Sequence, residues 1–307
     1  MKKYWAFALH NRRSGAPERG SESTTGRLRR LGAAILLVTG LVGAVAPAVA
    51  AEGETVHIAP RQDGDGELNA VLWRPATDRP APAIVVLHGC GGLWTAKGDL
   101  GRRETDWARR FTDAGWVVLF PDSFGSRGLG SQCSTVERTA RTWKERVADT
   151  RRAFDWLAAQ AFVRPDAIAL MGWSNGGSTV LNAVRTKNRP ATGDFRAAVA
   201  FYPGCRPMAA NPAWTSRVDL LILIGEADDW TPIEPCRTLA AAHPDRLTLV
   251  GYPGAFHDFD NPSAPVRERR GLAYTAGGTG VAHVGTDPAA RADAIRRVPD
   301  WFAAHLK

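Results

Sequence analysis

Short, continuous apolar runs alternate along this chain with longer helix-like segments, and this alternation is the feature that most constrains the fold. Blocks such as AIVVL and LLILI are typical of parallel strands that are covered on both faces. We expect strands near Thr55–Ala59, Leu68–Trp73, Ala83–His88, Trp116–Phe120, Ile168–Trp173, Ala197–Tyr202, Leu220–Gly225 and Leu247–Tyr252. The pattern predicts a mostly parallel, doubly wound α/β sheet of about eight strands flanked by helices, with no second domain.

Two helices are indicated by their own signals. One apolar stripe between Val136 and Ala161 steps alternately by four and three residues, with Arg and Asp off the stripe, and predicts the longest helix. Asp287 followed by Pro288 is a typical cap and first helical position, so a last helix is expected to begin there. Pro299 predicts a kink in it.

The motif that carries chemistry is GWSNG at Gly172–Gly176, with a further glycine at Gly177. The apolar run IALM precedes it as a strand, and SNGGSTVLNAV follows as the start of a helix. A nucleophile elbow needs this arrangement, because its serine occupies a strained turn and the flanking glycines allow close backbone packing. Ser174 is therefore the candidate nucleophile, and the alternative is an unreactive glycine-rich turn.

A serine hydroxyl needs a base at neutral pH. We favour His257, in YPGAFHDF after the last strand, over His283 in VAHVG. The acid that orients the histidine is expected after LLILIG, where Asp228 and Asp229 compete and Glu226 is a third choice. The order serine, acid, histidine is that of α/β-hydrolases. One of the two aspartates would otherwise cap the next helix.

Two backbone amides are expected to bind the oxyanion of a tetrahedral intermediate. The first is the N–H of Asn175, directly after the candidate nucleophile. The second is the N–H of Cys90, in the turn HGCGG that follows AIVVL. His88 is interpreted as a residue that shapes this turn rather than as a base.

Taken in order, HGCGG, PDSFGSRG, GWSNGG, GEADDWTP and GAFHDF resemble the dienelactone hydrolase family of α/β-hydrolases over roughly residues 55–305. The resemblance implies a triad of Ser174, Asp228 and His257. It favours Asp228 over Asp229 because the family's aspartate lies four residues before a proline, here Pro232.

Two positions depart from the family pattern. Dienelactone hydrolases proper carry cysteine where this chain has Ser174, and an arginine where it has Asn261. Arg127 falls within one residue of the family's other substrate-binding arginine. The departures favour a broader ester or lactone hydrolase. Side chains in or beside the strand-end loops are candidates for the substrate pocket: Trp94, Phe124, Arg127, Trp173, Tyr202 and Trp230.

Four cysteines, Cys90, Cys133, Cys205 and Cys236, allow three disulfide pairings. Each of the pairs 90–133 and 205–236 follows two successive strands, so we favour these pairings; the alternative is four buried thiols. No C-x-x-C or His/Cys cluster indicates a metal, and the proposed chemistry needs no cofactor.

Residues 1–50 resemble an export signal. They combine a basic stretch, an uncharged segment from Leu31 to Ala51 and the small-residue sequence Ala48-Val49-Ala50. Cleavage is expected after Ala50, leaving residues 51–307 as a periplasmic or secreted domain. The alternative is an N-terminal membrane anchor.

The net charge of +8 mostly belongs to this segment. Residues 1–50 hold eight Lys/Arg and two Glu, so the remainder has 31 basic and 29 acidic residues, a net +2. This distribution argues against nucleic-acid binding. The sequence predicts an exported serine hydrolase acting on a small-molecule ester or lactone. Alternatives are a peptidase or acyltransferase on the same scaffold, or a non-catalytic binding protein of hydrolase fold.

Overall fold

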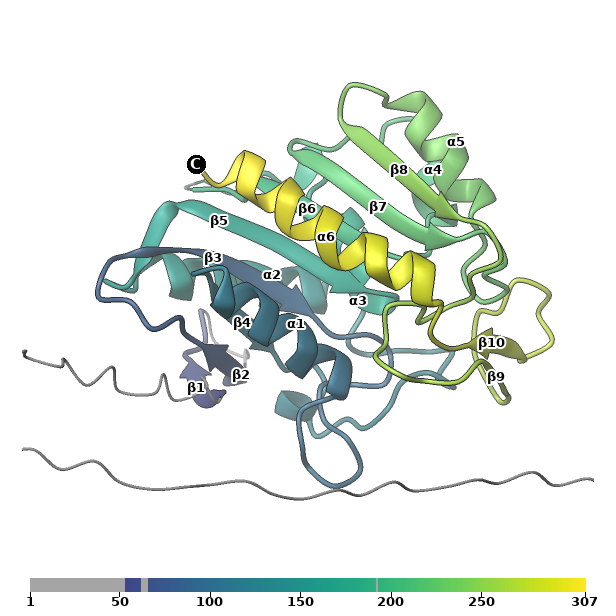
Figure 1. Cartoon of the computed structure of the whole chain (residues 1–307), viewed down its shortest axis with the longest axis horizontal. Helices are drawn as coiled ribbons and strands as arrows, with labels where there is room; N and C mark the ends of the chain where they lie inside the picture. Colours follow the sequence, from purple (N-terminus) through teal and green to yellow (C-terminus); the bar gives the residue numbers. More distant parts are fainter. Residues whose placement is uncertain (1–52, 62–65, 192) are drawn as a thin grey trace, which may run out of the picture. The chain divides into compact units, whose positions relative to one another are not determined.

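An eight-stranded sheet forms the centre of the unit Ala48–Lys307 (Figure 1), of which the computed structural model describes residues 53–61, 66–191 and 193–307. Its strands, in order across the sheet, are β1 (Glu54–Ile58), β2 (Leu68–Trp73), β4 (Val117–Pro121), β3 (Ala81–Leu87), β5 (Val163–Trp173), β6 (Ala197–Phe201), β7 (Asp219–Gly225) and β8 (Leu247–Tyr252). β2 pairs antiparallel with β1 and β4, and all other neighbours pair in parallel. The predicted mostly parallel sheet is confirmed.

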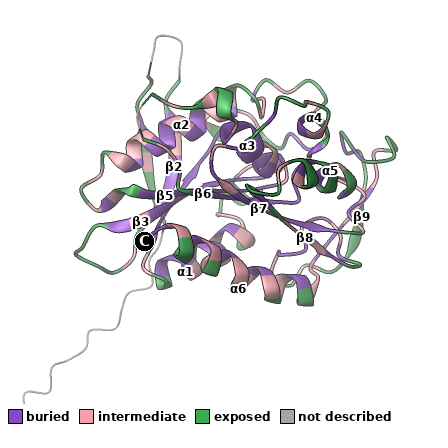
Figure 2. Ribbon diagram, turned by 90° about the horizontal axis from the view of Figure 1, so that it is seen from above, coloured by how far each residue is buried: buried purple, intermediate pink, exposed green. Residues whose placement is uncertain are grey.

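Helices cover both faces of this sheet, as Figure 2 shows. On one face lie α1 (Arg102–Asp113) and α6 (Pro288–His305); on the other lie α2 (Glu145–Ala158), α3 (Asn175–Ala183) and α5 (Glu234–Ala242). The shorter elements are η1 (Gly125–Arg127), η2 (Thr186–Asn188), α4 (Arg206–Ala209) and the antiparallel pair β9 (Arg267–Arg269) and β10 (Ala282–Val284). Because helices cover both faces, the continuous apolar strands β3, β4, β6 and β7 are almost wholly buried.

The helix predicted between residues 136 and 161 is only partly right. α2 begins at Glu145, and residues 136–144 form turns instead. The disulfide at Cys133 ties the chain to another loop just before this segment. Val136 and Trp143, two members of the predicted apolar stripe, are 64% and 62% exposed. The predicted stripe therefore combined residues of a loop with residues of a helix. The longest helix among the described segments is α6, with 18 residues against 14 in α2.

The last helix begins where the sequence predicts. The side chain of Asp287 accepts a hydrogen bond from the N–H of Ala290 at 2.8 Å, and Pro288 is the first helical residue. The helix continues through Pro299. The predicted export signal, residues 1–50, lies outside the described residues. Within the described ranges, no helix combines the length and apolarity needed to cross a membrane.

Candidate active site

Ser174 occupies a strained turn between β5 and α3. Its backbone has φ 51° and ψ −112°, a conformation that residues other than glycine rarely adopt. The turn is held by a hydrogen bond from its N–H to the carbonyl of Phe201 at 2.9 Å. A Cβ on Gly176 would lie 2.2 Å from the carbonyl oxygen of Leu87, and one on Gly172 would lie 2.6 Å from the backbone of residue 176. The glycines of the motif are therefore required by close backbone packing.

His257, after β8, is buried with one ring nitrogen paired. Its Nδ1 lies 2.7 Å from Oδ2 of Asp228, and both side chains are at most 1% exposed. Oδ1 of Asp228 accepts the backbone N–H groups of Trp230 and Thr231 at 2.9 and 2.8 Å. These bonds fix the carboxylate, which in turn fixes the imidazole with its proton on Nδ1.

The other candidates for base and acid pair with different partners. Asp229 accepts from Nδ1 of His283 at 2.8 Å, and both side chains are about two-fifths exposed. Glu226 accepts from Arg237 at 2.7 Å. The structure thus places Asp228, and neither competitor, against His257.

Nε2 of His257 is buried and makes no hydrogen bond within the described part of the chain. The ring lies between Tyr202 and Trp230, with centroid distances of 4.5 and 4.8 Å. Burial opposes protonation of this ring, but the charge and hydrogen bond of Asp228 outweigh it and raise the pKa of His257. An imidazole with its proton on Nδ1 has a basic lone pair on Nε2, which suits a general base.

The raised pKa predicts how activity depends on pH. Only neutral His257 can accept a proton, so kcat/KM for a neutral ester is expected to increase with pH through a midpoint above 6.5, the ordinary histidine value. The measurement is a pH–rate profile. His283→Gln is the control and should leave the midpoint in place. A midpoint below 6.5, or one that moves in the control, would contradict the assignment.

The two candidate oxyanion donors lie on the same cavity as Ser174. Asn175 is the first residue of α3, so its N–H has no acceptor within the helix. Cys90 follows β3 in a turn whose carbonyl groups at Leu87 and His88 pack against Gly176. Both Cys90 and Asn175 line the cavity. The elbow and the β3 turn therefore meet where a reacting carbonyl would be bound.

Arg146 of α2 connects these two turns and was missed by the sequence analysis. Its guanidinium is fully buried and donates to the side-chain oxygen of Asn175 and to the carbonyl of His88, the latter at 2.8 Å. Burial lowers the pKa of Arg146 to about 9. Burial and the charge of Arg146 hold the pKa of His88 well below its ordinary value, so His88 is neutral.

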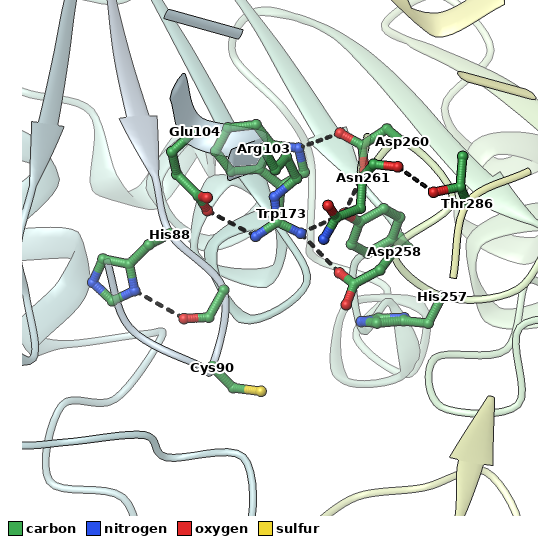
Figure 3. Close-up of polar contacts among 12 residues, drawn as sticks. His88, Cys90, Arg103, Glu104, Trp173, His257, Asp258, Asp260, Asn261 and Thr286 are labelled. Atoms are coloured by element: carbon green, nitrogen blue, oxygen red, sulfur yellow. Dashed lines mark hydrogen bonds and ion pairs between the residues drawn. The ribbon is translucent and has the colours of Figure 1, made fainter. Parts of the chain in front are cut away.

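A second arginine, Arg103 of α1, has a side chain only 11% exposed and lies near Trp173 and Asp258 (Figure 3). It donates to Asp258 at 2.8 Å, to Glu104 at 2.8 Å and to the hydroxyl of Tyr202 at 2.9 Å. Its guanidinium also lies over the ring of Trp173, 4.6 Å from the centroid. This network fixes the residue that follows His257.

The cavity that holds Ser174 has a volume of about 600 Å³. Its walls come from residues 136–143, α3 with the turn after it, the segment from Gly204 to Met208, and Trp230–Pro232 with Tyr274. Both disulfides border it. The favoured pairings are confirmed, with bonds between Cys90 and Cys133 and between Cys205 and Cys236. In the described ranges, no group of three or more His, Cys, Asp or Glu is placed to hold a metal ion.

The sequence profile of the dienelactone hydrolase family matches residues 68–306. The chain belongs to this family. Dienelactone hydrolases are α/β-hydrolases, and the mostly parallel sheet with helices on both faces agrees with that membership.

Three relatives illustrate the likeness. The quorum-quenching protein AidA of Acinetobacter baumannii is 28% identical over 199 residues, which cover 64% of this chain and 60% of AidA. The chain thus spans about 60% of that relative's length. A promiscuous, dienelactone hydrolase-like phosphotriesterase from metagenomic libraries superposes with a TM-score of 0.63 at 20% identity, covering 84% of this chain and all of that one. Esterase 2 of Thermogutta terrifontis, phosphorylated by paraoxon, gives a TM-score of 0.55 at 20% identity, covering 83% and 94%. The structures show the shared fold.

Most of the predicted pocket residues do not line the cavity. Of the six predicted, only Trp230 belongs to its wall. Trp173 and Tyr202 are fully buried and donate to Asp260, at 2.9 and 2.7 Å. Trp107 donates to the same carboxylate at 2.8 Å. These two predicted residues belong to a buried hydrogen-bond network that was invisible in the sequence, because the shared acceptor follows β8.

The other three predicted pocket residues also have partners elsewhere. Trp94 donates to Asp122 at 2.8 Å, and Phe124 packs edge-on against the buried ring of His88. Arg127 makes two hydrogen bonds, at 2.8 and 2.9 Å, to Asp149. That ion pair lies outside the cavity wall.

Asn261, the other departure from the family pattern, also has a structural partner. The backbone carbonyl of Asn261 accepts a hydrogen bond from the hydroxyl of Thr286. The family holds its substrate with arginines at positions that correspond to Asn261 and to within one residue of Arg127 in this chain. Neither residue lines the cavity.

Proposed function

We propose that this protein is an exported serine hydrolase that cleaves ester or lactone bonds through Ser174, His257 and Asp228. The observation that carries the proposal is the buried His257–Asp228 pair, in which Nε2 of His257 has no partner among the described residues, together with the strained backbone of Ser174. Such a pairing of nucleophile, base and orienting acid is the general solution for activating a hydroxyl group.

In the proposed reaction, Ser174 Oγ attacks the carbonyl carbon while Nε2 of His257 takes its proton. The carbonyl π-bond opens, and the resulting oxyanion accepts hydrogen bonds from the N–H groups of Cys90 and Asn175. Collapse of the intermediate breaks the bond to the alcohol oxygen, which receives the proton from His257. Water then attacks the acyl-enzyme by the same route, releasing the acid and restoring Ser174.

Export is supported by the two disulfides, because such bonds persist in oxidising compartments and are rare in the cytosol. Which esters and lactones the protein cleaves is tested directly with a panel of candidate substrates. The similarity to a putative carboxymethylenebutenolidase of Azospirillum brasilense, 26% identical over 206 residues, gives one reason to include lactones beside aryl esters in that panel.

The test is hydrolysis of short-chain aryl esters and simple lactones by the full chain and by Ser174→Ala. Removal of the nucleophile is expected to lower kcat by at least about 10³-fold, because only the oxyanion donors and binding then remain. Asn182→Ala, on the same helix and cavity wall, is the control and should retain the reaction. Equal rates for wild type and Ser174→Ala would refute the mechanism.

A further inference from the structure

The cavity that holds Ser174 is lined by charge of one sign. Five basic side chains contribute to its wall: Arg138, Arg141, Arg185, Lys187 and Arg206. No aspartate or glutamate is among the residues that line it. A cleft lined by one sign of charge concentrates ligands of the opposite sign, since its low-dielectric walls focus the field.

Two of these cations already have partners. Arg141 pairs with Glu145, donating from its Nε at 2.9 Å. Arg138 donates to the carbonyl of Gln132 at 3.0 Å and lies over the ring of Tyr274. The charge of Arg141 is therefore matched by a carboxylate, and the guanidinium of Arg138 is already held by neutral partners.

The other three cations are available. The side chains of Arg185, Lys187 and Arg206 make no hydrogen bond or ion pair with any residue in the described ranges. We call these three residues the basic end of the cavity. An anion bound there would be their first charged partner.

The basic end extends away from the nucleophile along α3. Ser178 and Asn182 follow Ser174 at helical spacing and line the cavity on one face of α3, and Arg185 comes two residues after the helix ends. With a rise of 1.5 Å per residue, the nine-residue helix carries the chain roughly 14 Å from the nucleophile before Arg185 is reached. Lys187 follows in η2. Arg206 comes from the neighbouring segment, where the N–H of Gly204 donates to Ser178 at 2.9 Å.

Apolar side chains also line the cavity. Met208, Pro207 and Trp230 belong to its wall, and Val136 and Trp143 add large exposed side chains. Exposed apolar surface that gathers at one cavity is typical of a binding site for an apolar ligand segment. The cavity therefore combines apolar wall residues with three cations that have no partner among the described residues.

We infer that this protein selects elongated esters that carry an anionic group remote from the scissile carbonyl. The carbonyl binds at Ser174, an apolar spacer lies against the wall beside Trp143 and Met208, and the anion binds Arg185, Lys187 and Arg206. This inference rests on the proposed function. It assigns a substrate shape, with the charge a helix length away from the reacting bond.

The test uses substrate pairs that differ only in charge. p-Nitrophenyl monoesters of succinic, suberic and dodecanedioic acids are compared with the same esters whose free carboxyl is a carboxamide. A second arm places the charge on the alcohol side, with acetate esters of ω-hydroxy acids against their carboxamides. For the longest members of at least one arm, the acid is expected to exceed its carboxamide about tenfold in kcat/KM, mostly through KM.

The short members should show no preference, and added salt should reduce the preference of the long ones. The triple variant Arg185→Gln/Lys187→Gln/Arg206→Gln should remove the preference while carboxamide hydrolysis stays unchanged. Arg79→Gln/Arg109→Gln/Arg196→Gln is the matched control, since it removes the same net charge from positions outside the cavity wall.

Two failures are distinguishable. Ser174-dependent hydrolysis without any preference for a remote acid, or a preference that the control variant also removes, would overturn this inference and leave the proposed function standing. Absence of hydrolysis of every ester would refute the proposed function and this inference with it.

Discussion

Replacing Asp228 with asparagine is expected to lower kcat about 10⁴-fold while the protein stays folded. In the wild-type protein, the carboxylate of Asp228 accepts a hydrogen bond from Nδ1 of His257 at 2.7 Å. An asparagine amide in the same place can donate to Nδ1, which moves the ring proton to Nε2 and leaves no lone pair toward Ser174. It also removes the negative charge that stabilises the imidazolium. The measurement is single-turnover and steady-state hydrolysis of a p-nitrophenyl ester.

Asp229→Asn is the matched control for this prediction. Asp229 is the neighbouring carboxylate and has an equivalent contact, at 2.8 Å, with His283. Because both side chains of that pair are about two-fifths exposed and His283 belongs to β10, the control should change kcat by less than a few fold. A larger effect at residue 229 than at residue 228 would contradict the assignment of the acid.

Replacing Arg146 with methionine is the second large effect that we expect. Its guanidinium bonds both the side chain of Asn175 and the carbonyl of His88, so it holds together the two turns that carry the candidate oxyanion donors. It is also a buried cation without a carboxylate in hydrogen-bond reach among the described residues. Its removal is expected to lower kcat about 10²-fold with little change in KM, the size of effect known for oxyanion-hole donors.

Arg152→Met separates this positioning role from a general loss of stability. Arg152 lies on the same helix, is also buried, and donates to the carbonyls of Ile58, Ala59 and Gly66. We expect it to lower the melting temperature without lowering kcat. Arg146→Met should in addition weaken binding of a trifluoromethyl ketone, which mimics the oxyanion, more than it weakens substrate binding. Equal losses of kcat in both variants would show that Arg146 is merely structural.

The sheet and the elbow were predictable because local sequence determines them. Continuous apolar runs mark strands that are covered on both faces, and the glycines around Ser174 mark a turn whose packing admits no Cβ. His257 and Asp228 could be predicted as partners because parallel strands bring their carboxyl ends to one edge of the sheet, and the two side chains do lie 2.7 Å apart, while their catalytic roles stay predictions. All four cysteines follow strands there too, which made their pairing predictable.

The parts that sequence reasoning missed depend on contacts between distant segments. A charged residue on a helix is usually solvated, yet Arg146 is fully buried and Arg103 is only 11% exposed, each against polar partners from other elements. Trp173 and Tyr202 were interpreted as pocket residues because nothing nearby in sequence indicates their acceptor, Asp260. The same limit hid the basic end of the cavity, which joins α3 to a loop after β6.

The most direct test of the central claim is to trap the nucleophile. The full chain is treated with a fluorophosphonate, its intact mass is measured, and the modified peptide is sequenced by mass spectrometry. The account predicts one adduct on Ser174, formed slowly or not at all in Asp228→Asn. Ser178, one turn along α3, donates its hydroxyl to the carbonyl of residue 174 and should remain unmodified. An adduct on Ser178 or on another residue, or ester hydrolysis by a protein that forms no adduct, would contradict the account.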